Sequence, residues 1–359
     1  MFNNSEGKMN YPRVLTIAGS DSCGGAGIQA DIKAIQATGS YAASAITAVT
    51  VQNTLGVQAV HTVPTDIVRG QIRAVLTDIG ADAIKIGMLA SAELVLTVRD
   101  AIIEQNGQEQ NRQEQNGLGQ NRWEQNRLEQ NGQGQNGLEQ NRWEQNRLEQ
   151  NGQGQNGLER SNDLFPLKDS QSNDQPQLIR PNDLFPLIVL DPVMVATSGD
   201  RLIEESAVET LKNELVPYAR VLTPNIPEAE ILAGISINGQ SDLPDAARLI
   251  SKAVSTLPGR KVSVLMKAGH LENDMLIDYF YNADEDHIIE LPARRVESRN
   301  THGTGCTLSS ALASYLAQGL PLDDAVRAAK HYIAQAIESG ARYNIGNGHG
   351  PVDHFFMLH

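Results

Sequence analysis

Short apolar runs alternate with helix-like segments along most of the chain, and this alternation restricts the possible fold more than any other feature. The apolar runs are rich in Val, Ile and Leu, and the segments between them carry apolar residues at helical spacing. We expect strands at residues 14–18, 44–51, 83–87, 188–191, 219–223 and 262–267 and a strand pair over 275–291, and helices at 26–38, 66–76, 92–103, 206–215, 227–233, 244–256, 307–318 and 322–340. Repeated units of this kind predict an α/β fold, a mostly parallel sheet with helices on both faces.

Polar, glycine-rich segments follow several of the expected strands. They are Gly19-Ser20-Asp21, Gln52-Asn53-Thr54, Gly87-Met88, Asp191-Pro192 and Pro224-Asn225. In open α/β sheets, ligands bind at the carboxyl ends of the strands. The sequence therefore predicts that these segments meet at one ligand site.

The segment 300–307 combines a glycine-rich turn with the start of a helix, because Gly303, Thr304 and Gly305 precede a run rich in Ala, Leu and Ser. The first amides of a helix have no internal acceptor, so this place is suited to a transferring phosphate. Cys306 lies in the expected first turn, where a thiol ionises more easily. Two plainer interpretations stay open: the glycines form only a tight turn, and Cys306 is a small buried residue.

Asp191, Asn225 and Glu228 form a second polar group after buried strands. Carboxylates in such places commonly hold Mg²⁺, directly or through water. Helix capping by Asn225 and a solvated first-turn charge at Glu228 are equally simple explanations. The chain has neither the Gly-x4-Gly-Lys-Ser/Thr loop of P-loop enzymes nor a kinase-type His-Arg-Asp, so these two classes are excluded.

Residues 104–187 differ from the rest of the chain. A Gln/Asn-rich text repeats every five residues, and a longer repeat brings Trp123 back as Trp143. A period of five gives neither a helical face nor a strand face, and the composition is typical of disorder. We expect an insertion in one helix-to-strand connection, which leaves 12–103 and 188–359 as a single discontinuous domain. A role in interactions is the less favoured alternative to a neutral insertion.

The charge balance excludes several classes of partner. The 359 residues carry a formal charge of -14, with an isoelectric point near 5.0, which speaks against nucleic acid and anionic membrane. No apolar run approaches the ~20 residues that a membrane span needs. The two cysteines, Cys23 and Cys306, form no disulfide framework, and residues 1–13 lack the apolar region of a secretory signal. We therefore expect a cytoplasmic protein.

The ordered motifs resemble those of the hydroxymethylpyrimidine/phosphomethylpyrimidine kinase family, a thiamin-biosynthesis branch of the ribokinase-like superfamily. The resemblance covers about residues 12–103 and 188–356. It is carried by residues 15–21 (LTIAGSD), 24–31 (GGAGIQAD), 52–58 (QNTLGVQ), 85–89 (KIGML), 191–194 (DPVM), 198–200 (SGD), 223–228 (TPNIPE), 300–308 (NTHGTGCTL) and 350–355 (GPVDHF). It implies a ribokinase-like fold, ATP and Mg²⁺ as cofactors, a homodimer, and two successive phosphorylations of a hydroxymethylpyrimidine.

The resemblance also implies roles for single residues. The pyrimidine would lie near Gly19, Ala26, Asp31, Thr50, Gln52 and Met88. Gln52 offers a donor and an acceptor to the aminopyrimidine edge, and Asp31 could hold the hydroxymethyl group. Cys306 would take the hydroxyl proton while the amides of Gly303, Gly305 and Cys306 stabilise the phosphate. Asp191, Asn225 and Glu228 would organise Mg²⁺, and Lys267 and Thr304 would contact the nucleotide.

The chain departs from the family pattern at Cys23, where Ser is more usual, and at Ala268, where Gly is usual. Two rival functions remain open. A pyridoxal or pyridoxine kinase of the same fold is the nearer one. A catalytically inactive binding module is the other, and the completeness of the expected site argues against it.

Overall fold

The computed structural model describes residues 11–105, 107, 186–194, 203–269, 271 and 274–359. All of these belong to one compact unit, Met1–Gln108 with Pro181–His359. The Ser198-Gly199-Asp200 motif and most of the expected insertion lie outside the described residues. None of the described helices is both long and apolar enough to cross a membrane.

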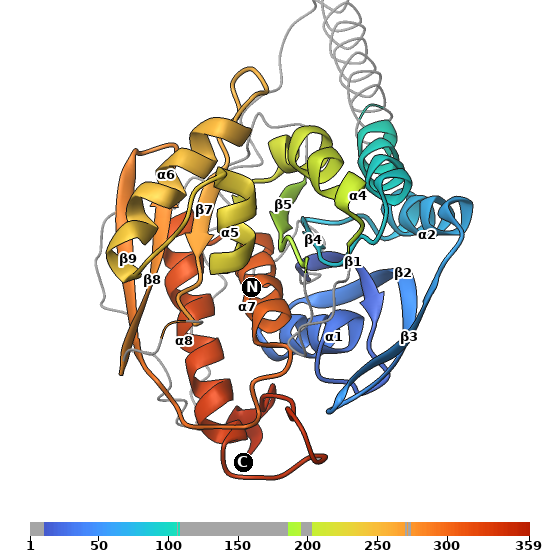
Figure 1. The fold of residues 1–359 in the computed structure, drawn as a ribbon. Coiled ribbons are helices and arrows are strands. Elements are labelled where there is room, and N and C mark those ends of the chain that lie inside the picture. Colours follow the sequence, from blue (N-terminus) through green and yellow to red (C-terminus); the bar gives the residue numbers. More distant parts are fainter. Residues whose placement is uncertain (1–10, 106, 108–185, 195–202, 270, 272–273) are drawn as a thin grey trace, which may run out of the picture. The chain divides into compact units, whose positions relative to one another are not determined.

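In the described part of this unit, a single sheet of nine strands has the order β3-β2-β1-β4-β5-β6-β7-β8-β9 (Figure 1). Six strands from β2 to β7 are parallel, whereas β3, β8 and β9 join the two edges antiparallel. The strands are β1 Arg13–Ser20, β2 Tyr41–Asn53, β3 Gly56–Thr62, β4 Ala83–Ile86, β5 Leu187–Leu190, β6 Val221–Leu222, β7 Ser263–Met266, β8 Met275–Asn282 and β9 His287–Arg294. The predicted mostly parallel sheet is confirmed.

Helices cover both faces of the sheet, and each face has its own apolar core. The helices are α1 Gly27–Ala37, α2 Thr65–Asp78, a helix over 92–105, α4 Glu205–Thr210, α5 Ile226–Ala233, α6 Leu243–Val254, α7 Thr304–Ala317 and α8 Leu322–Gly340. One core joins α2, the 92–105 helix, α4, α5 and α6 to the sheet. The other joins α1, α7 and α8. Burial on both faces explains why the central strands β4 and β7 consist of buried residues throughout.

The clearest differences from the sequence predictions lie in three places. The strand expected at 44–51 extends over Tyr41–Asn53 and turns into β3, which was not predicted. β3 is an edge strand with mostly exposed residues, so it lacks the apolar pattern that identifies a buried strand. The strand expected at 219–223 is reduced to Val221–Leu222. The helix expected at 206–215 changes at Leu211 into a π-helical turn, Leu211–Leu215.

Candidate active site

A cavity of about 1420 Å³ opens at the carboxyl ends of the parallel strands. The segments that follow β1, β4, β5, β6 and β7 contribute to its wall, as does the N-terminus of α7. Of the residues expected at the site, all but Asp31 line this cavity: Gly19, Ala26, Thr50, Gln52, Met88, Asp191, Asn225, Glu228, Lys267, Gly303, Thr304, Gly305 and Cys306.

The N-terminus of α7 supplies amides to the cavity. Gly303 has φ 81°, and a Cβ at this position would lie 1.7 Å from the Gly25 carbonyl oxygen, so only glycine fits. The first intrahelical bond runs from the Thr307 amide to the Gly303 carbonyl at 2.9 Å. The amides of Gly305 and Cys306 precede it and therefore have no acceptor within the helix. An anion in the cavity could accept hydrogen bonds from both.

An ion pair that is largely buried lies directly beside these amides. Lys267 Nζ is 2.8 Å from Asp191 Oδ1 and 4.0 Å from Glu228 Oε2. A Cβ on Gly305 would lie 3.2 Å from Lys267 Nζ and 3.4 Å from Asp191 Oδ2. The helix N-terminus, one ammonium and two carboxylates thus share one wall of the cavity. The ammonium and the amides suit phosphate oxygens, whereas the carboxylates suit a cation.

Asn225 and Glu228 begin α5 with a capping box. The Asn225 Oδ1 accepts from the Glu228 amide at 3.0 Å, and Glu228 Oε2 accepts from the Asn225 amide at 2.8 Å. The capping alternative for Asn225 is therefore what the structure shows, and Asn225 still lines the cavity. Burial, assisted by Asp191, raises the pKa of Glu228 to about 7, although Lys267 and two backbone amides act against this. This corner of the site thus holds more negative charge than Lys267 balances.

Cys306 lies in the first turn of α7 as predicted, but its expected ease of ionisation was wrong. Burial raises the pKa of the Cys306 thiol to about 11, and the carboxylates of Asp31 and Asp191 add to the increase. Lys85 and a hydrogen bond from the Gly27 amide lower the pKa and only partly offset it. The helix N-terminus is outweighed because the thiol is partly buried near two negative charges.

Asp31 requires a second correction, because it does not line the cavity. It is completely buried in α1, where Lys85 Nζ lies 2.8 Å and 2.9 Å from its two oxygens. Thr16 Oγ1 donates to Asp31 at 2.6 Å and Ser310 Oγ at 2.8 Å. Asp31 has no exposed surface, and its two oxygens already accept from Lys85, Thr16 and Ser310, so the substrate hydroxymethyl group does not reach it. It holds Lys85 instead, and Lys85 does line the cavity.

Burial alone would lower the pKa of the Lys85 ammonium. The nearby negative groups, first Asp31 and then Cys306 and Asp191, together outweigh burial, and the pKa of Lys85 is raised. Lys85 therefore remains a cation close enough to Cys306 to act on it, and this positive charge is the main influence that favours the thiolate.

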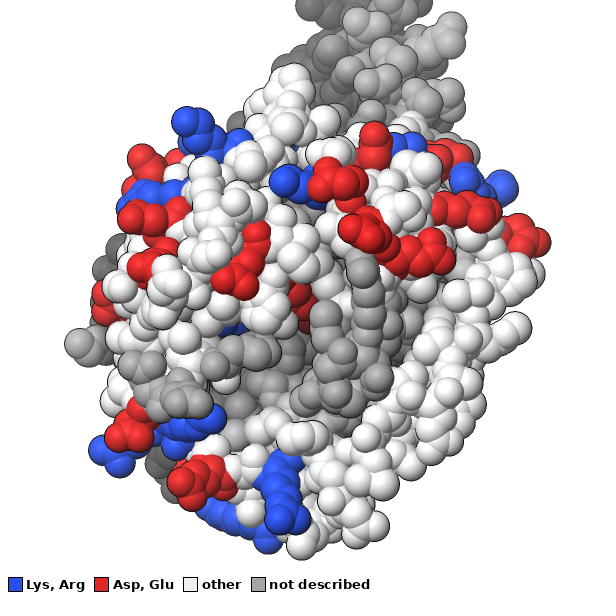
Figure 2. All heavy atoms as spheres, in the orientation of Figure 1, with Lys and Arg blue, Asp and Glu red and all other residues white. Residues whose placement is uncertain are grey.

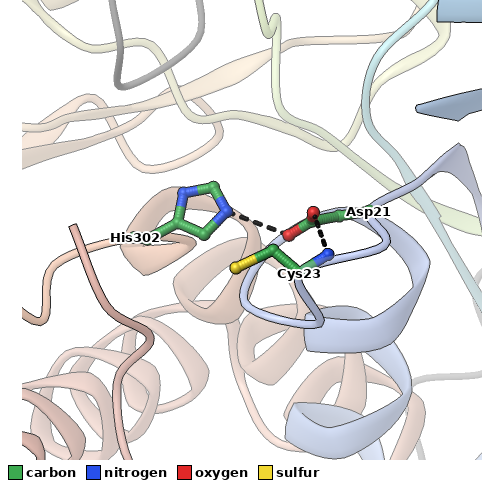
Figure 3. Close-up of side chains that lie close together, drawn as sticks. All are labelled: Asp21, Cys23 and His302. Atoms are coloured by element: carbon green, nitrogen blue, oxygen red, sulfur yellow. Dashed lines mark hydrogen bonds and ion pairs between the residues drawn. The ribbon is translucent and has the colours of Figure 1, made fainter. Parts of the chain in front are cut away.

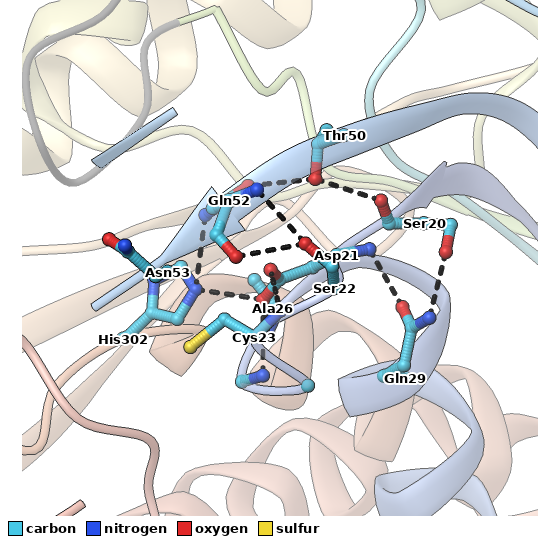
Figure 4. Close-up of polar contacts among 12 residues, drawn as sticks. Ser20, Asp21, Ser22, Cys23, Ala26, Gln29, Thr50, Gln52, Asn53 and His302 are labelled. Atoms are coloured by element: carbon cyan, nitrogen blue, oxygen red, sulfur yellow. Dashed lines mark hydrogen bonds and ion pairs between the residues drawn. The ribbon is translucent and has the colours of Figure 1, made fainter. Parts of the chain in front are cut away.

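The other half of the cavity is built from the ends of β1 and β2. Met88 packs against the end of β1 in this half: a Cβ on Gly19 would lie 3.0 Å from the Met88 methyl carbon. Thr50 Oγ1 donates to the Ser20 carbonyl at 3.0 Å, and its other contact is one end of the Gln52 carboxamide, 3.2 Å away. Figure 4 shows Gln52 between Thr50 and His302, above the turn that follows β1.

Two residues of this half, Asp21 and His302, were not singled out from the sequence. His302 Nε2 is 2.9 Å from Asp21 Oδ2 (Figure 3). Asp21 also accepts from the amides of Cys23, Gly25 and Ala26 at 2.8, 3.1 and 2.8 Å. Burial alone would raise the pKa of Asp21, but these hydrogen bonds, above all that from His302, lower it. The sequence did offer a signal for each: Asp21 directly follows β1, and His302 directly precedes Gly303.

Asp21, Cys23 and His302 bring metal-ligand atoms within 4.8 Å of one another. Both Asp21 oxygens are nevertheless already used by hydrogen bonds from three amides and the His302 ring. The arrangement is that of a rigid hydrogen-bond hub, which ties the turn after β1 to the loop before α7.

Known proteins share both the sequence and the fold. The model of a family described as phosphomethylpyrimidine kinase matches residues 21–110 and 177–353, more than half of the chain. Hydroxymethylpyrimidine/phosphomethylpyrimidine kinase of Rhizobium meliloti (strain 1021) is 38% identical over 341 residues, which are 95% of this chain and 96% of that protein.

Two solved structures have the same architecture. Phosphomethylpyrimidine kinase of Clostridium difficile 630 is 32% identical with a TM-score of 0.59, and the match covers 90% of this chain and 99% of that one. Pyridoxal kinase of Staphylococcus aureus in complex with pyridoxal is 27% identical with a TM-score of 0.65, covering 97% and 95%. Sequence identity is higher to the pyrimidine kinases, whereas the fold is common to both groups.

Proposed function

The chain belongs to the phosphomethylpyrimidine kinase family, and from this premise we propose that its cavity phosphorylates 4-amino-5-hydroxymethyl-2-methylpyrimidine and then the resulting monophosphate. ATP is the phosphate donor that the kinase family implies, and the diphosphate product serves thiamin biosynthesis. One observation carries the assignment to this cavity. The free amides at the start of α7 lie against Lys267 and Asp191, opposite the polar pocket around Gln52.

The pocket between β1 and β2 is the proposed pyrimidine subsite. Gly19, Ala26 and Met88 provide an apolar surface that suits the ring, and Gln52 offers hydrogen bonds to its amino edge. The substrate hydroxyl would then point toward Cys306. Asp31 has no part in this proposal except through Lys85.

The phosphate subsite comprises the amides of Gly303, Gly305 and Cys306 together with Lys267 and Thr304. These groups are donors or cations, which suits a phosphoryl group whose charge is spread over its oxygens during transfer. Cys306, as thiolate, would accept the hydroxyl proton while the hydroxyl oxygen bonds to phosphorus and ADP leaves. Because the transition state is loose, positioning matters more than the strength of this base.

The same wall fits a magnesium ion. Asp191 and Glu228 are hard oxygen donors, and together they exceed the single charge of Lys267. The raised pKa of Glu228 reflects burial and this excess of negative charge, which a divalent cation would balance. We propose that Asp191 and Glu228 hold Mg²⁺, directly or through water, with Asn225 keeping Glu228 in place. The ion would neutralise phosphate charge.

A test measures ATP consumption and product mass with the purified chain, Mg²⁺ and the hydroxymethylpyrimidine. We expect monophosphate and then diphosphate. The Cys306→Ala variant should lose roughly 10²- to 10⁴-fold in kcat, the usual contribution of a positioned base. Cys23→Ser is the matched control for a cysteine without an assigned role, and it should keep its activity.

The pH dependence of this reaction tests the thiolate directly. Since the pKa of Cys306 is about 11, the thiolate fraction grows as the pH rises from 7 to 9, and kcat/KM of the parent should rise with it. The Cys306→Ala variant should show no such increase. Equal activity of parent and variant over this range would remove Cys306 as the base.

Pyridoxal kinase is the second candidate, supported by the structural likeness to the Staphylococcus aureus enzyme. A side-by-side comparison of kcat/KM decides between the two substrates. A clear preference for pyridoxal would transfer the chain to that activity. No turnover on either substrate would favour an inactive binding module.

We further propose a homodimer formed through the β2–β3 hairpin. Residues 41–62 contain no Asp, Glu, Lys or Arg, and this part of the surface is white in Figure 2. Val49, Val51, Leu55 and Val60 are exposed there by 48, 55, 68 and 43%. An uncharged apolar edge of a sheet is usually covered by a partner. Sedimentation as a 38.9 kDa monomer would contradict this.

The reducing cytoplasm, which supplies ATP and keeps Cys306 a free thiol, is the proposed location.

A further inference from the structure

The carboxamide of Gln52 is held at both ends by protein groups. One end lies 3.3 Å from His302 Nε2, and the other lies 3.2 Å from Thr50 Oγ1 (Figure 4). The two ends differ in chemistry, because the oxygen only accepts and the NH₂ group only donates. Which end faces His302 therefore decides which hydrogen bonds Gln52 can offer to a ligand.

The state of His302 follows from Asp21. The Asp21 carboxylate accepts hydrogen bonds from the Cys23, Gly25 and Ala26 amides and its pKa is lowered, so it is ionised and acts only as an acceptor. The His302 Nε2 at 2.9 Å from Asp21 Oδ2 must consequently carry a proton. This holds for the neutral Nε2–H tautomer and for the doubly protonated ring alike.

A protonated Nε2 has no lone pair to offer to Gln52. If the NH₂ group of Gln52 faced His302, two donors would oppose each other, and Thr50 would have one proton for two acceptors, the Ser20 carbonyl and the Gln52 oxygen. With the oxygen of Gln52 toward His302, both conflicts disappear. The Nε2–H is then shared by Asp21 and Gln52, and Thr50 donates to Ser20 while accepting from the Gln52 NH₂ group.

We infer that His302, oriented by Asp21, sets the carboxamide of Gln52 with its oxygen toward the α7 side and its NH₂ group toward Thr50. His302 is thereby a positioning residue for substrate specificity. The inference rests on the proposed pyrimidine kinase function, in which Gln52 reads the aminopyrimidine edge. One N–H and one oxygen lone pair of Gln52 remain for that edge. Their order is fixed, with the acceptor on the α7 side and the donor on the Thr50 side.

The fixed order matters because the substrate is anchored at a second point. The hydroxymethyl group must reach Cys306, so the ring cannot turn over to suit a reversed carboxamide. A ring nitrogen beside an amino group matches only one order of donor and acceptor. A reversed or freely turning Gln52 would leave buried polar groups unpaired, which weakens binding by about 5- to 150-fold.

A substitution at Gly25 can move the His302 ring without changing the side chains of Gln52, Thr50 or Asp21. A Cβ on Gly25 would lie 2.5 Å from His302 Cδ2 and 3.1 Å from the Pro351 Cβ. Gly25 is not among the glycines with positive φ, so alanine is compatible with the backbone there. The Gly25→Ala variant should therefore displace the imidazole while its own backbone conformation is retained.

The direct test is nitrogen-15 NMR of the full chain labelled at histidine, with the His302 signals assigned by their loss in His302→Phe. The nitrogen chemical shifts distinguish a protonated from a bare Nε2. We expect a protonated Nε2 at neutral pH. A bare Nε2 with the proton on Nδ1 would overturn the inference whatever the substrate of the enzyme is.

The functional test compares KM and kcat for the hydroxymethylpyrimidine and for pyridoxal. His302→Phe keeps a ring but removes the donor, and Gly25→Ala displaces it. In both variants we expect KM for the pyrimidine to rise roughly 5- to 150-fold, while KM for ATP is unchanged and the preference over pyridoxal falls. His302→Gln, which restores an N–H, should regain at least part of the loss.

Gly70→Ala is the matched control for a glycine change, since nothing lies within 4 Å of its added Cβ. An unchanged pyrimidine KM in folded His302→Phe would overturn the positioning role while leaving the proposed function intact. Absence of pyrimidine turnover in the parent would instead remove the proposed function, and the NMR measurement would still decide the hydrogen-bond assignment.

Discussion

At the scale of single residues, the site depends on buried charges held by partners far away in the sequence. Asp31 and Lys85 are both completely buried and form an ion pair with each other. Breaking a buried pair leaves one uncompensated charge, which typically costs 3–5 kcal/mol. We therefore predict that Asp31→Asn lowers the free energy of unfolding by about this amount.

Urea unfolding of the parent and the variant measures this loss. Glu104→Gln is the control, because its ion pair with Arg69 is exposed and should contribute at most about 1 kcal/mol. A loss at Asp31 no larger than at Glu104 would show that the buried pair is not needed for stability. The prediction concerns stability, since Asp31 has no contact with the cavity.

His354 makes a prediction about acid stability. It is almost completely buried, and burial, with a smaller effect of Lys33, lowers its pKa from 6.5 to about 4. The unfolded chain therefore binds more protons than the folded chain between pH 6.5 and 4. Stability from this group is complete above pH 6.5 and is lost as the pH falls toward 4, by about 3 kcal/mol in all.

The His354→Gln variant should flatten this part of the stability curve, because its side chain does not titrate but can still accept from Thr307 Oγ1, which lies 3.0 Å from His354 Nε2. Denaturant unfolding at several pH values from 4 to 7 gives the slope. The same slope in both proteins would assign the acid sensitivity to other groups.

At the scale of single elements, the N-terminus of α7 joins folding to function through two glycines with different roles. At Gly303 an added Cβ would meet the Gly25 carbonyl oxygen at 1.7 Å, and φ is positive, so the backbone itself must move. At Gly305 the added Cβ would meet only Lys267 Nζ and Asp191 Oδ2, at 3.2 and 3.4 Å. The first glycine is needed for the turn, whereas the second leaves open the space that we propose for the phosphate.

We predict that Gly303→Ala fails to fold stably, losing more than about 2 kcal/mol through strain and steric overlap. Gly305→Ala should fold with nearly unchanged thermal stability but lose activity, because its methyl group occupies the space between the helix amides and Lys267. Thermal unfolding and kcat/KM for both variants separate the two effects. Full activity of Gly305→Ala would place the phosphate elsewhere in the cavity.

At the scale of the whole molecule, the repeat sequence of residues 104–187 stands between the helix over 92–105 and β5 in the chain. The family model matches on both sides and leaves 111–176 unmatched. β4 and β5, on the two sides of this connection, are neighbouring parallel strands of the sheet. We propose that 104–187 is an insertion without a catalytic role.

Replacement of 104–187 by a linker of about five residues should leave kcat/KM for the pyrimidine within about twofold. The free energy of unfolding should rise by up to about 2.4 kcal/mol, because the length of the loop is halved about four times and each halving lowers the entropic cost of closing it by about 0.6 kcal/mol. Denaturant unfolding and steady-state kinetics of the shortened chain give both numbers. A folded but inactive product would show that the repeat contributes to catalysis.

Much of the fold and the position of the cavity could be read from local patterns. Alternating apolar runs and helical segments predicted the parallel sheet, because burial on both faces requires such runs. The glycine-rich segments after strands predicted where the cavity opens, since parallel strands end at one edge. Gly303 and Gly305 were placed before a helix by their order in the chain alone.

Only the tertiary structure decided what the buried polar residues do. Asp31 meets Ser310 from 279 positions away, and Asp21 meets His302 from 281 positions away, so no local pattern could pair them. The pKa of Cys306 depends on its burial and on Lys85, Asp31 and Asp191, which come from three different elements or loops. A sequence determines which residues are available at the end of each strand. Which of them face a ligand, and in which charge state, follows from the neighbours that folding brings together, because electrostatic and hydrogen-bond energies depend on distance and burial and not on position in the chain.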